Sequence, residues 1–247
     1  MTDSFYLLAS SGGFLENMRW AALLFIALVV SISLHEFGHA WAADKCGDPL
    51  PRRMGRVTLN PLAHADRTGT LIIPALMIFV PALMGGLPQF IFGWGKPVLV
   101  SLPNRETRTK DDILTTLAGP AMNLLLAVLG AVLLGISAGV FGSANTAPVT
   151  FFILFIQLNL ALMIFNLMPI PPLDGSRLLF YAVKMKEETY YKLAGNAWWI
   201  LLALILLPAP GNSFLSYIFR PIFEFTFDPL IYFADWIARL FPAGGNF

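Results

Sequence analysis

MRWAALLFIALVVSISLHEFGHAWAA, the sequence of residues 18–43, is the stretch that decides the fold. Only its HEFGH section, residues 35–39, interrupts the apolar character. A helix of about 20 apolar residues can cross a bilayer, so this stretch predicts a transmembrane helix. No basic region precedes it and no small-residue cleavage site follows it, so we do not expect a cleaved signal peptide.

Apolar stretches recur along the rest of the chain. The further candidate spans are residues 70–84, 113–141, 148–168, 193–208 and 214–241. The last is the least regular, because it contains Arg220, Glu224, Asp228 and Asp235. We therefore expect an all-α polytopic membrane protein with five or six transmembrane helices.

The overall composition supports a membrane protein. The chain is 57% hydrophobic and 13% charged, whereas soluble proteins average roughly 25% charged residues. Its net charge of +1 gives no electrostatic reason to expect a nucleic-acid partner. The single cysteine, Cys46, cannot form an internal disulfide. Without repeats or a long polar stretch, residues 1–247 are expected to form one membrane-embedded domain.

Basic residues predict the orientation, because they favour the cytoplasmic side of a membrane. Residues 1–19 contain one, Arg19, whereas the segment after the first span contains Lys45, Arg52, Arg53, Arg56 and Arg67. HEFGH is therefore expected near the cytoplasmic face. Residues 104–112 are also charged, so the segment before them should start and end on that side. We expect a short re-entrant or β-hairpin segment near residues 85–103.

The HEFGH section carries the chemistry. His35 and His39 are one helical turn apart and share a face, so both imidazoles can bind one zinc ion. Glu36 beside them can act as general base on a zinc-activated water. Packing histidines and a buried glutamate would be the alternative. Ionisable groups inside a membrane are expensive, however, so three together indicate function.

A catalytic zinc needs a third protein ligand, and the usual soluble patterns do not supply one. The positions where a metzincin would have Gly and His hold Ala42 and Lys45. No glutamate occurs between Glu36 and Glu106. The remaining candidates are Asp44, His64, Asp66, Asp111, Asp112 and Asp174.

Among these candidates, Asp44 lies too close to the histidines along the same helix. Asp174, in NLMPIPPLDG, follows the 148–168 span at its predicted cytoplasmic end. The orientation places it at about the depth of HEFGH, so we predict that Asp174 is the third ligand. An N-cap for the helix that follows is the alternative role.

Five motifs together resemble the site-2 protease family. They are HEFGH at 35–39, NPLAHADRTGT at 60–70, FGWGKPV at 92–98, AGPAMN at 118–123 and NLMPIPPLDG at 166–175. The resemblance covers about residues 20–185, the expected catalytic core, with accessory C-terminal helices at about 189–241. It implies an intramembrane zinc metalloprotease with Zn²⁺ held by His35, His39 and Asp174.

The resemblance also suggests roles for the other motifs. It implies that Asn166 holds the substrate or the developing oxyanion. FGWGKPV is interpreted either as a strand edge that pairs with an unwound substrate or as a loop anchored at the interface by Trp94. His64 is expected to orient its loop or meet the substrate, and Asp66 to cap a helix or support the site. Gly119, Pro120 and Asn123 are interpreted as packing features near the site.

The function predicted from the sequence is hydrolysis of peptide bonds in or near transmembrane segments of other proteins. The expected location is a bacterial or archaeal cell membrane, with the active site near the cytoplasmic side and lipid around it. Three alternatives stay open: another zinc-dependent membrane enzyme or short-peptide peptidase, an inactive partner-binding relative, and a metal transporter. The sequence predicts no particular natural substrate or oligomeric state.

Overall fold

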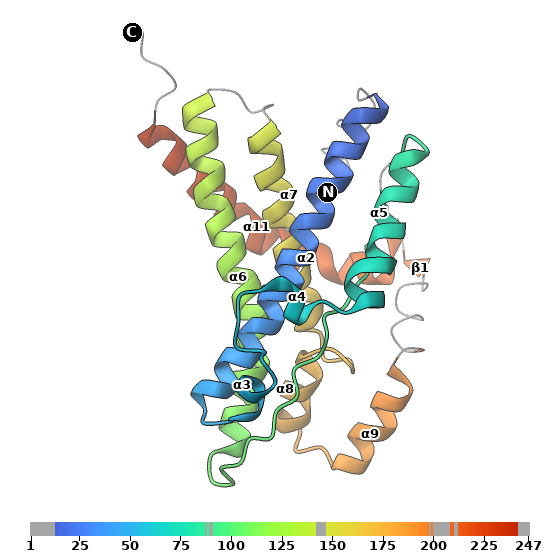
Figure 1. Ribbon diagram of the computed structural model, residues 1–247, viewed down its shortest axis with the longest axis vertical. Coiled ribbons are helices and arrows are strands. Elements are labelled where there is room, and N and C mark those ends of the chain that lie inside the picture. Colours follow the sequence, from blue (N-terminus) through green and yellow to red (C-terminus); the bar gives the residue numbers. More distant parts are fainter. Residues whose placement is uncertain are drawn as a thin grey trace.

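The computed structural model describes residues 13–86, 88, 91–141, 147–197, 199, 208–209 and 212–241. Three of its helices are long and apolar enough to cross a membrane: α2 (Phe14–Lys45), α6 (Arg108–Phe141) and α7 (Ala147–Asn166). They lie side by side in the centre of the molecule (Figure 1). The predicted helical fold class is confirmed, and these helices match the expected spans 18–43, 113–141 and 148–168.

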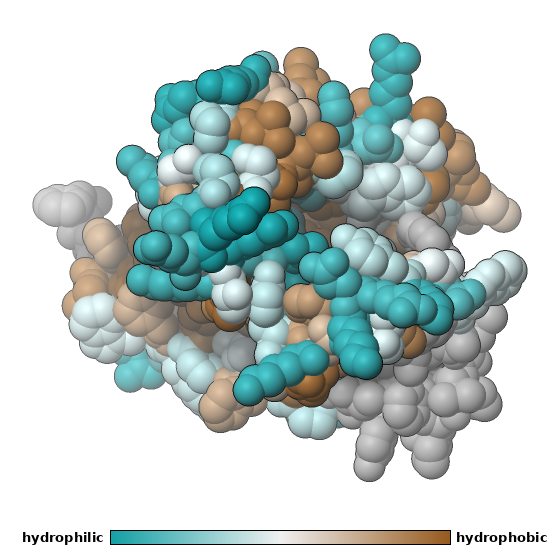
Figure 2. Space-filling model, turned by 90° about the horizontal axis from the view of Figure 1, so that it is seen from below, coloured by the Kyte–Doolittle hydropathy of each residue, from teal (hydrophilic) through white to brown (hydrophobic). Residues whose placement is uncertain are grey.

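The other elements surround these helices. In chain order they are α3 (Leu50–Arg53), α4 (Pro61–His64), the π-helix η1 (Arg67–Ile72), α5 (Ile73–Leu83), α8 (Gly175–Ala182), α9 (Glu187–Gly195), the antiparallel pair β1 (Pro208–Ala209) and β2 (Asn212–Ser213), and α11 (Phe214–Leu240). Figure 2 shows the molecule from below, where α3, α8 and α9 lie, and hydrophilic residues gather there.

The helices pack through small residues and apolar side chains. A Cβ at Gly38 of α2 would lie 2.6 Å from the carbonyl oxygen of Ala118 in α6, so the backbones approach more closely than larger residues allow. Such small-residue contacts are common between membrane helices. Further along, α6 and α7 share a buried apolar cluster that includes Ala127, Ala131 and Leu160.

The expected count of five or six spans is not confirmed. The predicted span at 70–84 is the short apolar helix Arg67–Leu83, formed by η1 and α5. The predicted span at 193–208 lies largely outside the described residues. At 214–241 the chain does form one long helix, α11, but its charged residues distinguish it from the three apolar helices.

Helix α11 crosses α6 and α7 obliquely (Figure 1). The crossing is close because α6 carries glycines there: a Cβ at Gly135 would meet the carbonyl of Ala234, and one at Gly139 the carbonyl of Phe241. Two ion pairs, Arg220–Glu224 and Arg239–Asp235, lie along α11 itself.

The predicted re-entrant or hairpin segment near 85–103 is also not confirmed. Residues 91–103 run as one extended segment without strand pairing (Figure 1). The buried Arg56 guanidinium donates to the carbonyls of Lys96 and Pro97, at 3.0 Å each. The buried Asp48 carboxylate accepts hydrogen bonds from Ser101 N and Oγ, at 2.5 and 2.6 Å. These two side chains hold the extended segment in place through hydrogen bonds that a neighbouring strand would otherwise supply.

Candidate metal centre

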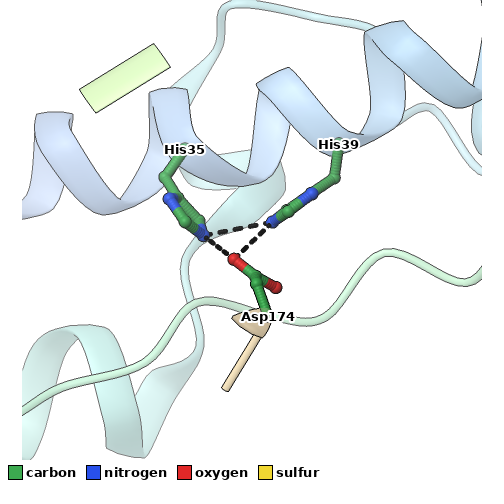
Figure 3. Close-up of side chains that lie close together, drawn as sticks. All are labelled: His35, His39 and Asp174. Atoms are coloured by element: carbon green, nitrogen blue, oxygen red, sulfur yellow. Dashed lines mark hydrogen bonds and ion pairs between the residues drawn. The ribbon is translucent and has the colours of Figure 1, made fainter. Parts of the chain in front are cut away.

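The site begins at the C-terminal half of α2. His35 and His39 lie on one face of this helix, and their Nε2 atoms are 3.1 Å apart. Both rings point toward Asp174, which comes from a distant part of the chain (Figure 3). Asp174 Oδ2 lies 3.2 Å from His35 Nε2 and 3.3 Å from His39 Nε2. The structure therefore brings together the three residues that the sequence predicted as ligands.

Asp174 occupies the N-cap position of α8, but its side chain does not cap that helix. Its backbone is α-helical, with φ −55° and ψ −42°, and no side-chain capping hydrogen bond forms. The turn before α8 is tight because the Gly175 main chain lies against the carbonyl of Leu167, where a Cβ would overlap it. The carboxylate is consequently directed away from the helix and toward the histidines.

The outer nitrogen of each imidazole is held by an oxygen atom. His39 Nδ1 lies 2.7 Å from the main-chain carbonyl of Thr115, and His35 Nδ1 lies 2.6 Å from Asn123 Oδ1. A carbonyl oxygen can only accept, so His39 carries a proton on Nδ1, and Nε2 is the nitrogen that can bind a metal. Such outer hydrogen bonds typically fix the tautomer of a metal-binding histidine.

The donor set fits a zinc ion. Tetrahedral ligand atoms about 2.0–2.1 Å from zinc are separated by about 3.3 Å, close to the 3.1–3.3 Å observed. Asp174 Oδ2 is buried and accepts no hydrogen bond in the described part of the chain.

The AGPAMN motif lies directly against the ligands. A Cβ at Gly119 would overlap the rings of His39 and His35, so only glycine lets α6 approach them this closely. Asn123 in the same motif contacts His35. Sequence reasoning interpreted both residues as packing features. The sequence feature that points to a role for Asn123 is its polar amide in a mostly apolar span.

The extended segment lies beside Glu36. A Cβ at Gly95 would overlap the Glu36 side chain. Trp94 N donates to the carbonyl of Gly69 at 3.1 Å, and Lys96 N donates to that of His64 at 2.8 Å. Because successive residues of an extended chain face opposite sides, the backbone groups of Gly95 face away from those partners. Gly95 has no backbone hydrogen bond within the described chain.

The other candidate ligands lie outside the cluster and have structural partners. Asp44 pairs with Arg52 at 2.6 Å, and Thr107 Oγ1 donates to Asp111 at 2.6 Å. Asp66 accepts from the amides of Thr68 and Gly69, which confirms its predicted role as a cap.

His64 holds its own loop together. Its Nε2 lies 2.9 Å from the carbonyl of Thr58, and its own carbonyl accepts from Lys96 N. Burial and the nearby Arg56 lower the pKa of this imidazole, although its bond to Thr58 opposes the shift. These contacts agree with the predicted loop-orienting role.

Asp112 ties α8 to α6. It accepts from Arg177 Nη2 and from the Tyr181 hydroxyl, at 2.5 Å each. Burial and the hydrogen bond to Asp112 raise the pKa of Tyr181 to about 12, so this hydroxyl stays a donor. Since Arg177 follows Asp174 by three residues, the contact holds the turn that carries the predicted ligand.

Asn166, the predicted oxyanion or substrate residue, ends α7. Its amide Nδ2 donates to the carbonyl of Leu162 at 2.9 Å, within its own helix. A role toward substrate therefore stays a prediction.

Comparisons with known proteins agree with this geometry. The chain is 38% identical to "Putative zinc metalloprotease YwhC" of Bacillus subtilis over 78% of this chain and 83% of that protein. It is 32% identical to "Putative zinc metalloprotease Rip2" of Mycolicibacterium smegmatis over 91% and 78% of the two chains. It is 27% identical to "Zinc metalloprotease MJ0392" of Methanocaldococcus jannaschii over 78% and 44%. No solved structure matches the chain.

The sequence model of peptidase family M50 matches residues 23–147 and 139–208, which is most of the chain. These ranges contain His35, His39 and Asp174. The apolar helices α2, α6 and α7 agree with an integral membrane protein. The chain belongs to peptidase family M50, the site-2 protease family.

Proposed function

We propose that the chain hydrolyses peptide bonds in or near transmembrane segments of other membrane proteins. Its family and relatives make it a zinc metallopeptidase with Zn²⁺ as cofactor; the proposal concerns where it acts and which residues act. The observation that carries it is the triangle of His35, His39 and Asp174 beside Glu36, on a helix long and apolar enough to cross a membrane.

In the proposed mechanism, His35, His39 and Asp174 would hold a zinc ion, and the bound ion would supply Lewis-acid polarisation of a water molecule and of the substrate carbonyl. Glu36, one residue from His35 on α2, takes the proton of the attacking water. It then gives that proton to the amine that leaves. Asn166 steadies the negative charge that develops on the carbonyl oxygen, after its amide leaves the carbonyl of Leu162.

The substrate is proposed to bind as an added strand beside Gly95. A transmembrane helix hides its carbonyls in internal hydrogen bonds, so it must unwind locally before attack. The extended segment is held on one side by Gly69 and His64, and the backbone of Gly95 is left for a partner. Strand addition uses such an edge to present a substrate backbone, and Gly95 lies against the proposed base, Glu36.

The proposed location is a bacterial or archaeal cell membrane, with the site near the cytoplasmic face. The relatives come from bacteria and an archaeon, which supports the choice of membrane. Helix α3, which contains Arg52 and Arg53, lies at the lower end of the molecule (Figure 1), where hydrophilic residues gather (Figure 2), and this supports the orientation. Water can reach a site near that face more easily than one at the centre of the bilayer.

Cleavage of a defined substrate tests the proposal. The purified protein is assayed for zinc content and for cleavage of a transmembrane segment in lipid vesicles, and Glu36→Gln is compared with Glu16→Gln on the same helix. We expect Glu36→Gln to keep its zinc and lose about 10²–10⁴-fold in rate. Glu16, far from the site and paired with Arg19, should tolerate the change. Equal cleavage by both variants would contradict the mechanism.

A soluble peptide with the same cleavage sequence separates the membrane protease from a short-peptide peptidase. If the peptide is cleaved as fast as the embedded segment, the intramembrane part of the proposal is wrong. If zinc is bound and neither substrate is cleaved by the unaltered protein, proteolysis itself is contradicted.

A further inference from the structure

A line of buried hydrogen bonds crosses three helices and ends at His35. Asn123 of α6 and Asn159 of α7 are both completely buried. Asn123 Oδ1 lies 2.6 Å from His35 Nδ1. Asn123 Nδ2 donates to Asn159 Oδ1 at 3.1 Å, and Asn159 Nδ2 donates to the carbonyl of Phe155 at 2.9 Å. Sequence reasoning did not single out Asn159.

The direction of every bond in this line is fixed from the Phe155 end. A carbonyl oxygen only accepts, so the Asn159 atom that faces Phe155 must be the amide nitrogen. Asn159 then presents its oxygen to Asn123, whose facing atom must be nitrogen. Asn123 in turn presents its oxygen to His35. The Nδ1 atom of His35 must therefore carry a proton, and the Nε2 lone pair is left for a metal.

His39 reaches the same state by a shorter route. A main-chain carbonyl, that of Thr115, accepts directly from its Nδ1. A main-chain carbonyl cannot exchange its oxygen for a donor. The amide of Asn123 can, because a half-turn of its side chain swaps Oδ1 and Nδ2. His35 therefore needs a second group that prevents this rotation, and Asn159 lies where that group is needed.

We propose that Asn123 and Asn159 are positioning residues that hold His35 in its zinc-binding tautomer. Asn159 acts only through Asn123, by keeping the amide oxygen of Asn123 directed at His35. Without Asn159 the amide turns in part of the molecules and offers an N–H group to His35 Nδ1. That arrangement requires an unprotonated Nδ1, which places the proton on the Nε2 atom that faces Asp174. The inference rests on the zinc site of the proposed function.

Nitrogen NMR on the metal-free protein tests the inference without activity. The chain has only three histidines, so histidine labelled with ¹⁵N gives few signals, and His35 is assigned by its loss in His35→Gln. We expect Nδ1 of His35 to carry a proton in the unaltered protein, and a fraction of molecules to lack it in Asn159→Leu. Asn17→Leu is the matched control, because Asn17 is 5% exposed and lies at the far end of α2.

Zinc affinity, measured by competition with a chelator, provides the second readout. Asn123→Leu should raise the Kd for zinc about 10–100-fold, as loss of such a supporting residue usually does. Asn159→Leu should raise it by a smaller factor, set by the fraction of molecules in which the Asn123 amide has turned. The double variant should bind no more weakly than Asn123→Leu alone, because Asn159 acts through Asn123. Asn17→Leu should bind as the unaltered protein does.

Two results would overturn the inference. One is a fully protonated Nδ1 of His35 in Asn159→Leu, as in the Asn17→Leu control. The other is a double variant whose loss of zinc-binding free energy equals the sum of the losses in the two single variants, because additive losses indicate independent packing effects. Absence of zinc from the unaltered protein would instead contradict the proposed zinc site, and the NMR result on the metal-free chain would still decide the relay.

Discussion

Gly119 and Gly95 limit what can occupy the space around the proposed ligands and base. Neither position adopts an unusual backbone conformation, and each is a glycine because another side chain fills the place of its Cβ. At Gly119 those side chains are His39 and His35, and at Gly95 the side chain is Glu36. Alanine at position 119 should therefore impair zinc binding, whereas alanine at position 95 should impair catalysis.

Gly119→Ala is expected to weaken zinc binding by at least about tenfold, because the added methyl group displaces both imidazoles from the position that zinc needs. Zinc content after dialysis against a chelator measures the effect. Gly130→Ala on the same helix is the control, because its Cβ would meet the side chains of Ile156 and Phe155 at 3.0 and 3.1 Å and these can shift. Full zinc occupancy in Gly119→Ala would show that α6 does not press on the ligands.

Gly95→Ala is expected to keep zinc and to lose about 10²-fold in kcat, a loss that a displacement of about 1 Å can cause. Its Cβ would push Glu36 while leaving the three ligands untouched. Steady-state cleavage together with zinc content measures this, with Gly86→Ala as control, since a Cβ there makes an ordinary 3.6 Å contact. A loss of zinc without a loss of kcat in the loaded fraction would refute the placement of Glu36.

At the scale of the elements, α8 matters because it begins beside Asp174. Its position depends on the contact of Arg177 and Tyr181 with Asp112 at the start of α6. The Asp112 side chain is 5% exposed, whereas that of Arg177 is 48% exposed. Water therefore partly screens the ion pair, and breaking it costs less free energy than breaking a fully buried pair. This contact joins the predicted ligand turn to the helix that also supports both histidines.

Asp112→Asn is expected to release zinc faster and to lower the free energy of unfolding by about 1.5–3 kcal/mol, the usual contribution of hydrogen bonds to a charged group. Chelator-induced zinc release and thermal unfolding measure the two effects. Glu188→Gln is the control, because its ion pair with Lys192 is exposed on both sides and such pairs contribute about 0–1 kcal/mol. Zinc release at the control's rate would mean that α8 does not depend on this contact.

The elements also differ in how far the sequence alone predicts them. Helices α2, α6 and α7 follow from their long apolar stretches, and the meeting of His35 with Asp174 follows from motif and orientation. The course of residues 91–103 does not, because it depends on Arg56 and Asp48, which bind it from another part of the chain. The role of Asn123 depends likewise on which helices face it, and the local sequence around Asn123 does not predict those neighbours.

At the scale of the whole molecule, orientation decides which side of the membrane supplies water to the site. The polar end that contains α3 and α8 is the end to which HEFGH is closer along α2 (Figure 1). Cys46, the chain's single cysteine, directly follows α2 at this end and is half-buried. It is therefore a built-in reporter of orientation.

A maleimide that cannot cross membranes should label Cys46 in inside-out vesicles and leave it unlabelled in intact cells. Burial raises the pKa of the Cys46 thiol, and Asp111 adds to the shift. Because the thiolate reacts, labelling should be slow at neutral pH and speed up as the pH approaches that raised pKa. Phe14→Cys in a Cys46→Ser chain, at the exposed opposite end of α2, should label in intact cells. The reverse pattern would invert the proposed topology.

The two imidazoles differ in whether their tautomers depend on the side chains of neighbouring residues. Every amino acid brings the same carbonyl, so a substitution at position 115 leaves the acceptor for His39 in place. The acceptor for His35 is the side chain of Asn123, which is oriented by the side chain of Asn159. During divergence, position 115 should therefore vary freely as far as His39 is concerned, whereas positions 123 and 159 should change together or not at all. An alignment of family members that retain both histidines can test for that covariation.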